Sequence, residues 1–205
     1  MLDESRAAAN RKAREERKAT HLRGIYERYA GQFRAAGNQD APAVARGIHA
    51  EIDNLLERDR KQSANSGAIR CGKGCAHCCH GPVEIWPHEA VLLVEFAREA
   101  GIEPDAARLE RQSRYSADNW RQQPAADRAC GFLGEDGACR IYESRPNACR
   151  KLLVLTDPAL CNAARHPPES VERWYSWEAE ILESAALETF SADLMPRALL
   201  NALKR

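Results

Sequence analysis

Apolar side chains recur at helical intervals in the first part of the chain. In residues 4–36 they stand three or four positions apart, at Leu22, Ile25, Tyr29 and Phe33. This spacing places side chains on one face of an α-helix. Ala, Arg, Glu and Lys, which are good helix formers, fill most of the other positions. The pattern predicts a helix over residues 4–36.

A second apolar stripe follows at about residues 42–64. Asp40-Ala41-Pro42 is typical of a helix start, because an Asp side chain accepts hydrogen bonds from the first backbone N–H groups and proline fits the first turn. The stripe consists of Val44, Ile48, Ile52, Leu55 and Leu56. The two predicted helices form an N-terminal helical arm or hairpin over residues 1–66.

Proline and glycine mark the elements in the middle of the chain. A helix is expected to begin at Pro87 and to end near residue 100, and another is expected over residues 104–122. Val83–Ile85 fits a short extended segment between loops. Asp157-Pro158 is expected to open a short helix that carries Cys161.

Two further segments complete the predicted elements. Residues 130–142 contain the turn signal Glu135-Asp136-Gly137 between apolar residues, which predicts a small hairpin. A long helix is expected from Glu169, with Trp174 and Trp177 on its buried face, and a last helix closes the chain. No serial strand–helix units are predicted, so the fold class is mainly α.

Composition indicates one folded unit, or at most two. The chain has 205 residues, of which 44% are hydrophobic, and 30 Lys and Arg balance 30 Asp and Glu. A net charge of zero argues against a general nucleic-acid or membrane-surface binder. No 18-residue apolar run is present, so no membrane span is expected. The charged start lacks the apolar core of a signal peptide, which makes the cytoplasm the expected compartment.

Charge is unevenly distributed between the two ends of the chain. Residues 1–36 carry nine basic and five acidic side chains, whereas residues 169–193 carry seven acidic and one basic. A basic arm for an acidic partner is one interpretation. The favoured interpretation is that the terminal helices pack together, or that both faces are only solvated.

Cysteine carries most of the chemical information. Disulfides are rare in the reducing cytosol, so clustered cysteines there more often bind metal or perform redox chemistry. One or two scattered cysteines would fit as small buried apolar residues, but four lie within nine positions of a glycine-rich segment. Metal binding is therefore the favoured interpretation for all eight cysteines: Cys71, Cys75, Cys78, Cys79, Cys130, Cys139, Cys149 and Cys161.

Thiolates are soft anionic donors that bind zinc and iron tightly. By number, eight thiolates suffice for two four-thiolate sites, or for one cluster with spare thiols. Neighbouring side chains diverge, so Cys78 and Cys79 should play different roles. We expect one to join Cys71 and Cys75 and the other to reach towards the later cysteines, which should lie beside the first four in space.

The cysteine pattern resembles a known family. The segment C71-x3-C75-x2-C78-C79, followed by Cys139–Arg150 with the sequence CRIYESRPNACR, is similar to the CxxCxxCC cysteine-cluster family. This YkgJ-like family is described as zinc- or iron-chelating, and flagellin N-methylase-type proteins share its motif. The resemblance covers about residues 69–161, with a first spacing of three residues in place of two. It implies a zinc or iron site and says little about biological role.

Together these features predict a helical domain with a cysteine-rich metal-binding loop region and at most a small β-hairpin. The metal-binding domain is expected over residues 67–166, with C-terminal helices over 167–205 packing on it. His77 and His80 flank the cysteine pair as less favoured ligands. Three other polar residues lie between the later cysteines and suit either hydrogen bonding to thiolates or ordinary structural roles: Tyr142, Arg145 and Arg150.

Two functions fit this sequence. The first is a metal-binding protein that holds zinc or iron without catalysis of its own. The second is an enzyme that depends on an iron–sulfur cluster, such as a protein lysine N-methylase. Cys71-x3-Cys75-x2-Cys78 matches the spacing of radical S-adenosylmethionine enzymes, but the strand–helix units of their barrel are not predicted. No glycine-rich nucleotide loop follows a strand, and whether the chain is an enzyme stays open.

Overall fold

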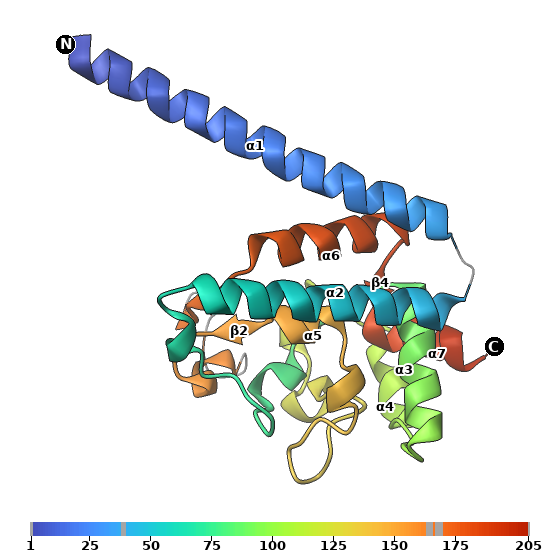
Figure 1. Cartoon of the computed structure of the whole chain (residues 1–205). Helices are drawn as coiled ribbons and strands as arrows, with labels where there is room; N and C mark the ends of the chain where they lie inside the picture. The colour runs from blue at the N-terminus through green and yellow to red at the C-terminus, as the bar shows by residue number, and fades with distance from the viewer. Residues whose placement is uncertain (1, 38–39, 163–165, 167–169, 205) are drawn as a thin grey trace.

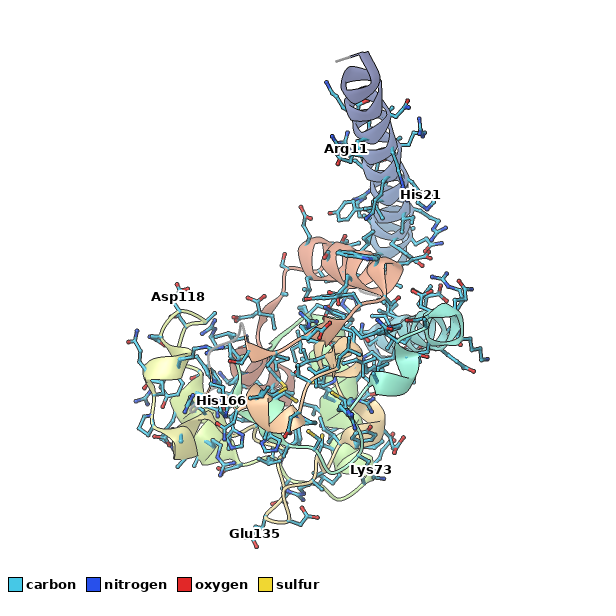
Figure 2. The ribbon with its side chains drawn as sticks, turned by 90° about the vertical axis from the view of Figure 1, so that its left-hand side faces the viewer. Arg11, His21, Lys73, Asp118, Glu135 and His166 are labelled. Atoms are coloured by element: carbon cyan, nitrogen blue, oxygen red, sulfur yellow. The ribbon has the colours of Figure 1, made fainter. Side chains whose placement is uncertain are left out.

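The two N-terminal helices run antiparallel in the computed structural model, which describes residues 2–37, 40–162, 166 and 170–204. They are α1 (Leu2–Ala36) and α2 (Ala41–Gln62), and α6 (Trp177–Thr189) lies between them (Figure 1). Asp40 Oδ1 accepts a hydrogen bond from Ala43 N at 3.2 Å, which confirms the predicted helix start. The N-terminal part of α1, with Arg11, extends beyond the rest of the chain (Figure 2).

The remaining helices are shorter and lie among long loops, so the predicted mainly α class is confirmed. The other α-helices are α3 (Pro87–Glu99), α4 (Ala106–Gln112), α5 (Asn147–Lys151) and α7 (Met195–Leu203). Single turns of 3₁₀-helix are η1 (Ser66–Ala68), η2 (His77–His80), η3 (Trp120–Gln122), η4 (Ala125–Arg128), η5 (Tyr142–Ser144) and η6 (Pro158–Cys161). None of these described helices carries an apolar stretch long enough to cross a membrane.

Two antiparallel strand pairs connect segments that are distant in sequence. β1 (Glu84–Ile85) pairs with β4 (Asp193–Leu194), and β2 (Leu153–Val154) pairs with β3 (Arg173–Trp174). Each pair fastens the C-terminal part of the chain to a segment that adjoins cysteines. The expected hairpin in residues 130–142 consists of one bridge, between Leu133 and Cys139.

Two apolar clusters lie on either side of the cysteine loops. The first is formed mainly by α1, α2 and α6 and includes Phe33, Ile52, Trp86 and Leu182, and Cys71 packs against it. The second is formed mainly by α3, α4 and α7, and Cys130 and Cys139 pack against it. Its largest members are Ile85, Leu93, Leu109, Phe132, Ile141 and Leu199. The loops that carry the cysteines are therefore positioned by two separate cores.

The terminal helices pack together, as the charge distribution indicated. Arg28 of α1 lies 2.7 Å from Glu178 of α6, and Arg58 of α2 lies 2.8 Å from the other carboxylate oxygen of Glu178. One acidic residue thus bridges two basic residues from two helices, so this part of the charge asymmetry is satisfied within the chain.

The helix predicted over residues 104–122 is wrong beyond its first two turns. α4 ends at Gln112, and Ser116 and Asn119 exchange side-chain to backbone hydrogen bonds in the following turn. Such local bonds compete with the helical ladder. A separate 3₁₀ turn, η3, then forms at Trp120–Gln122.

The long helix expected from Glu169 is also wrong in its extent. Pro167, Pro168 and Glu169 lie outside the described residues, but the next segment is the strand β3, and α6 begins only at Trp177. Trp174 is buried as expected, whereas Trp177 has 59% of its surface exposed. Pairing of β3 with β2 replaces the helical ladder here, so the two tryptophans do not share one helical face.

The two tryptophans provide a matched test of this arrangement. Trp174→Ala should lower the free energy of unfolding by about 3–5 kcal/mol, because a buried ring that also donates to Ser63 Oγ at 3.1 Å leaves a cavity. Trp177→Ala should cost about 1 kcal/mol or less, since its contacts with Tyr175 and Lys18 are solvent-exposed. Urea unfolding measures both, and equal losses would contradict the assigned burial.

Candidate metal centre

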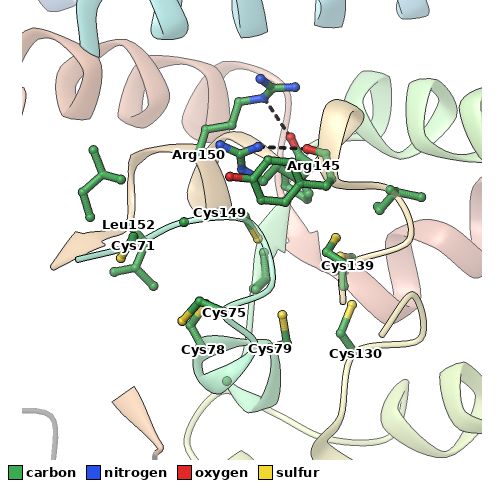
Figure 3. Close-up of a pocket in the computed structure, with 18 of the residues that line it drawn as sticks. Cys71, Cys75, Cys78, Cys79, Cys130, Cys139, Arg145, Cys149, Arg150 and Leu152 are labelled. Carbon is green, nitrogen blue, oxygen red and sulfur yellow. Dashed lines mark hydrogen bonds between the residues drawn. The ribbon is translucent and has the colours of Figure 1, made fainter. Parts of the chain in front are cut away.

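Seven of the eight cysteines line one cavity of about 470 Å³ (Figure 3). They come from three segments of the chain, and they are Cys71, Cys75, Cys78, Cys79, Cys130, Cys139 and Cys149. The eighth, Cys161, ends η6, which packs against η2, the turn that carries Cys78 and Cys79. The prediction that the later cysteines lie beside the first four is confirmed.

Tight turns present the first four cysteines. Gly74 adopts a φ of +91°, which favours glycine, and Cys75 N donates to Gly72 O at 3.2 Å. Cys78 and Cys79 belong to η2, and their two thiols remain in contact although a 3₁₀-helix has about three residues per turn. In Figure 3 Cys79 lies between Cys78 and Cys130.

The later cysteines lie on short loops with defined backbone contacts. Cys130 N donates to Cys79 O at 2.8 Å, which fixes the two loops against each other. Backbone N–H groups also approach sulfur: Val154 N lies 3.3 Å from Cys71 Sγ, Phe132 N–H bonds the Cys130 sulfur, and Ile141 N–H bonds the Cys139 sulfur. Such bonds favour the thiolate over the thiol.

Burial favours the protonated thiol, and for most of these cysteines its effect on the pKa is larger than that of the backbone N–H groups. It raises the pKa of Cys130 and of Cys161 to about 11 and raises the pKa of Cys149 well above its ordinary value. The pKa of Cys78 is raised first by its hydrogen bond with Cys79 and then by burial. Without a cation these thiols hold their protons, so a bound metal must displace protons to obtain thiolate ligands.

Arginines surround the thiols with positive charge. Arg145 lowers the pKa of both Cys78 and Cys139, although burial and neighbouring thiols outweigh it. Arg60 acts in the same direction on the pKa of Cys71, and Arg108 acts on that of Cys130. Four thiolates around a divalent metal carry a net charge of −2, so this surrounding charge favours an anionic metal centre.

Arg150 and Arg145 also shape the loop between Cys139 and Cys149. Arg150 reaches Asp53 at 2.6 Å and donates to the carbonyl oxygens of Glu143 and Arg145. The Arg145 guanidinium lies 4.0 Å from the Tyr142 ring centroid and donates to Tyr142 O. In the described part of the chain these bonds go to carbonyl and carboxylate oxygens rather than to sulfur, so both arginines position the loop, and Arg145 also acts on the thiols through space.

The two histidines beside the cysteine pair lie outside the cavity. His77 is exposed, His80 is half-buried, and neither lines the thiol cavity. The carbonyl oxygen of His80 accepts a hydrogen bond from Trp120 Nε1 at 2.9 Å, which anchors the end of η2. The structure thus gives these histidines no place among the clustered donors.

A buried acid–base pair behind the cavity was missed in the sequence. Glu89 of α3 is fully buried, and its Oε1 accepts a 2.7 Å hydrogen bond from Asn147 N and lies 2.8 Å from His49 Nε2. Asn147 begins α5, the short helix that carries Cys149. Glu89 therefore connects α2 and α3 with α5, the helix that carries the candidate ligand Cys149. The sequence did contain a signal for this residue, because Glu89 stands four residues before Leu93 and therefore lies on the apolar face of the helix.

Burial keeps this pair neutral. It raises the pKa of Glu89 to about 8 and lowers the pKa of His49 to about 3, while the positive charge of Arg150 lowers both. A neutral pair in which one proton is shared between carboxyl and imidazole avoids the cost of burying two charges.

The thiols suit zinc or iron chemically but surround a wide space. In the part of the chain that the structure describes, no three His, Cys, Asp or Glu side chains already surround a point where one ion would sit. Bonds of about 2.3 Å to tetrahedral zinc would bring four sulfurs to about 4 Å from one another, whereas the iron and sulfide ions of a cluster stand between its thiolates. The donor set fits both groups.

A cavity ringed by cysteines on short loops and covered by helices defines a thiol-rich domain. Residues 70–167 match the model of the CxxCxxCC family, whose description is "Putative zinc- or iron-chelating domain". This match confirms the resemblance of the cysteine pattern to that family. Neither a curated protein nor a solved structure matches the chain significantly.

Replacing Glu89 with Gln should remove one pH-dependent loss of stability. The folded pKa of Glu89, about 8, lies above its ordinary value of 4.5, so the unfolded chain releases this proton first as the pH rises. The stabilisation is complete below the ordinary pKa and is lost as the pH rises through the folded pKa. The free energy of unfolding should therefore fall less between about pH 7 and 8 in Glu89→Gln than in the native protein.

The window lies above the ordinary pKa of His49, 6.5, so that His49 is largely neutral in both states. Glu99→Gln, at the exposed end of the same helix, is the matched control and should keep the native pH dependence. Equal slopes for Glu89→Gln and the native protein would show that Glu89 is ionised in the folded state.

Proposed function

We propose that this protein binds zinc or iron through its eight cysteine thiolates. The observation that carries the proposal is the convergence of seven cysteines, from three chain segments, on one cavity, with the eighth on a helix packed behind it. The proposed ligands are Cys71, Cys75, Cys78, Cys79, Cys130, Cys139, Cys149 and Cys161.

The cost of gathering these groups supports a cation as their partner. Burial raises the pKa of most of the thiols, yet backbone N–H groups are directed at three of the sulfurs and arginines surround them. Hydrogen bonds to sulfur and nearby positive charge favour thiolates, which are the form that coordinates metal. An array of neutral thiols gains little from either feature.

The surrounding helices support a domain organised around the metal. Residues 67–166 consist mainly of loops and single helical turns, and only part of this region, chiefly α3 and α4, packs in an apolar core. In our proposal this region is the metal-binding domain, the N-terminal arm over 1–66 covers one side, and the C-terminal helices over 167–205 pack on it. The bound metal would link the cysteine loops to one another, whereas each apolar core contacts the loops on one side only.

The cavity volume favours an iron–sulfur cluster over a single ion, and an enzyme that depends on such a cluster is our second, more specific candidate. A space of about 470 Å³ lined by seven cysteines is large for a single ion but accommodates a cluster. When bound, such a cluster supplies electron transfer. The residues of the chain would hold it through thiolates, screen its charge with Arg145, and exclude water with apolar side chains of the cavity wall, such as Leu153 and Met195.

Anaerobic purification followed by metal and sulfide analysis tests both candidates. The native chain should contain zinc or iron, and a Cys71→Ser, Cys149→Ser double variant should lose most of it. Ala76→Ser and Ala138→Ser are matched controls, because each places a serine next to a cysteine without removing a thiol. Iron with an equal amount of acid-labile sulfide and a broad visible absorption supports the cluster, and colourless zinc protein supports the simpler function.

Metal removal should destabilise the domain, because the binding free energy of a structural thiolate site is also folding free energy. For a zinc site this energy is on the order of 10 kcal/mol. A strong chelator should lower the melting temperature measured by circular dichroism, and added metal should restore it. A melting curve that is the same with and without bound metal would contradict a structural role.

A further inference from the structure

Cysteines on the two sides of the cavity pack against different apolar cores. Cys71 packs against the cluster formed by α1, α2 and α6, whereas Cys130 and Cys139 pack against the cluster formed by α3, α4 and α7. Cys71 and Cys75 lie on one side of the cavity and Cys130 and Cys139 on the other (Figure 3). The two groups are therefore held by different parts of the fold.

Cys161 belongs with the first group, although it is the last cysteine in the sequence. It ends η6, which packs on η2, and it does not line the cavity that the later cysteines share. Apart from burial, the groups that raise the pKa of Cys161 are chiefly Cys78, Cys71 and Cys75. The expectation that Cys161 groups with the other later cysteines is thus wrong, because the chain returns past β2 to the first loop.

Cys149 completes the second group. Apart from burial, the thiols that raise its pKa are Cys130, Cys78 and Cys139. It lies on α5, whose first residue is fixed by Glu89, on the side of the cavity above Cys79 (Figure 3). Three thiols thus gather on each side of the Cys78-Cys79 pair.

The Cys78-Cys79 pair lies between the two groups. In Figure 3 Cys79 lies between Cys78 and Cys130, and Cys79 O accepts the hydrogen bond from Cys130 N. Zinc and iron–sulfur sites commonly take four thiolates, so one thiol from the pair completes each group.

We propose that the domain holds two adjacent four-thiolate metal centres, which meet at the Cys78-Cys79 pair. This proposal rests on the metal-binding function proposed above. The first centre comprises Cys71, Cys75, Cys78 and Cys161, and the second comprises Cys79, Cys130, Cys139 and Cys149. The adjacent pair allows one short turn to serve both centres, and coupling between them follows from the contact of its two thiols.

Pulsed alkylation of the zinc-loaded full chain tests the two centres. The chain should bind two equivalents of zinc and protect all eight cysteines from iodoacetamide. As a chelator is added in steps, mass spectrometry should show Cys71, Cys75 and Cys161 losing protection as one set, and Cys130, Cys139 and Cys149 as another. A single zinc equivalent with one common loss of protection would overturn the proposal.

Two variants make the test independent of the order of release. Cys161→Ser should keep one equivalent of zinc and expose Cys71 and Cys75, while Cys149→Ser should keep one equivalent and expose Cys130 and Cys139. Ala159→Ser and Ala148→Ser, in the same short helices, are matched controls that should keep both equivalents.

The outcomes separate this proposal from the metal-binding function. Binding of zinc with loss of protection at all five cysteines that remain of the two sets in either variant, while circular dichroism shows a folded chain, would mean one shared centre. A native chain that binds neither zinc nor iron and leaves all eight cysteines reactive would overturn the metal-binding function itself. If a variant unfolds, the native titration alone decides, because one or two zinc equivalents are distinguishable without any substitution.

Discussion

The gathering of eight half-buried cysteines is the constraint on which the rest of the structure depends. Burial raises the pKa of most of these groups, so ionised sulfur is costly unless a cation is present. The surrounding chain offers what a metal-bound thiolate needs: N–H groups directed at sulfur and arginines nearby. A protein that only needed to fill this space could do so with apolar residues at lower cost.

The positions of the cysteine loops are determined by contacts at the ends of the loops. Apolar cores on two sides fix Cys71 and the segment from Cys130 to Cys139. Short strand pairs connect the C-terminal part of the chain to segments near these cysteines. Glu89 fixes the start of α5, and Arg150 fixes the loop before it through Asp53 and two carbonyl oxygens. These buried polar contacts are specific, so they determine position where the loops lack a regular backbone ladder.

The long N-terminal helix has a different role in this architecture. Its C-terminal half packs on α6, where Glu178 bridges Arg28 and Arg58, and its N-terminal part extends away from the cysteine region (Figures 1 and 2). The uneven charge of the two chain ends is thus used largely for packing between terminal helices. Helical stability here comes from burial of one face, since residues 10–20 of the helix are largely exposed.

Local sequence determined the elements whose signals are local. Proline and Asp at helix starts, apolar stripes and the cysteine spacing were sufficient for α1, α2 and α3 and for the family of the cysteine domain. Tertiary structure decided what depends on distant partners. β2 converts the expected start of a long helix into β3, and the return of η6 to η2 brings Cys161 to the first loop. Tertiary structure also decided the environment of Glu89, because the partners of this buried carboxyl group come from helices far apart in the sequence.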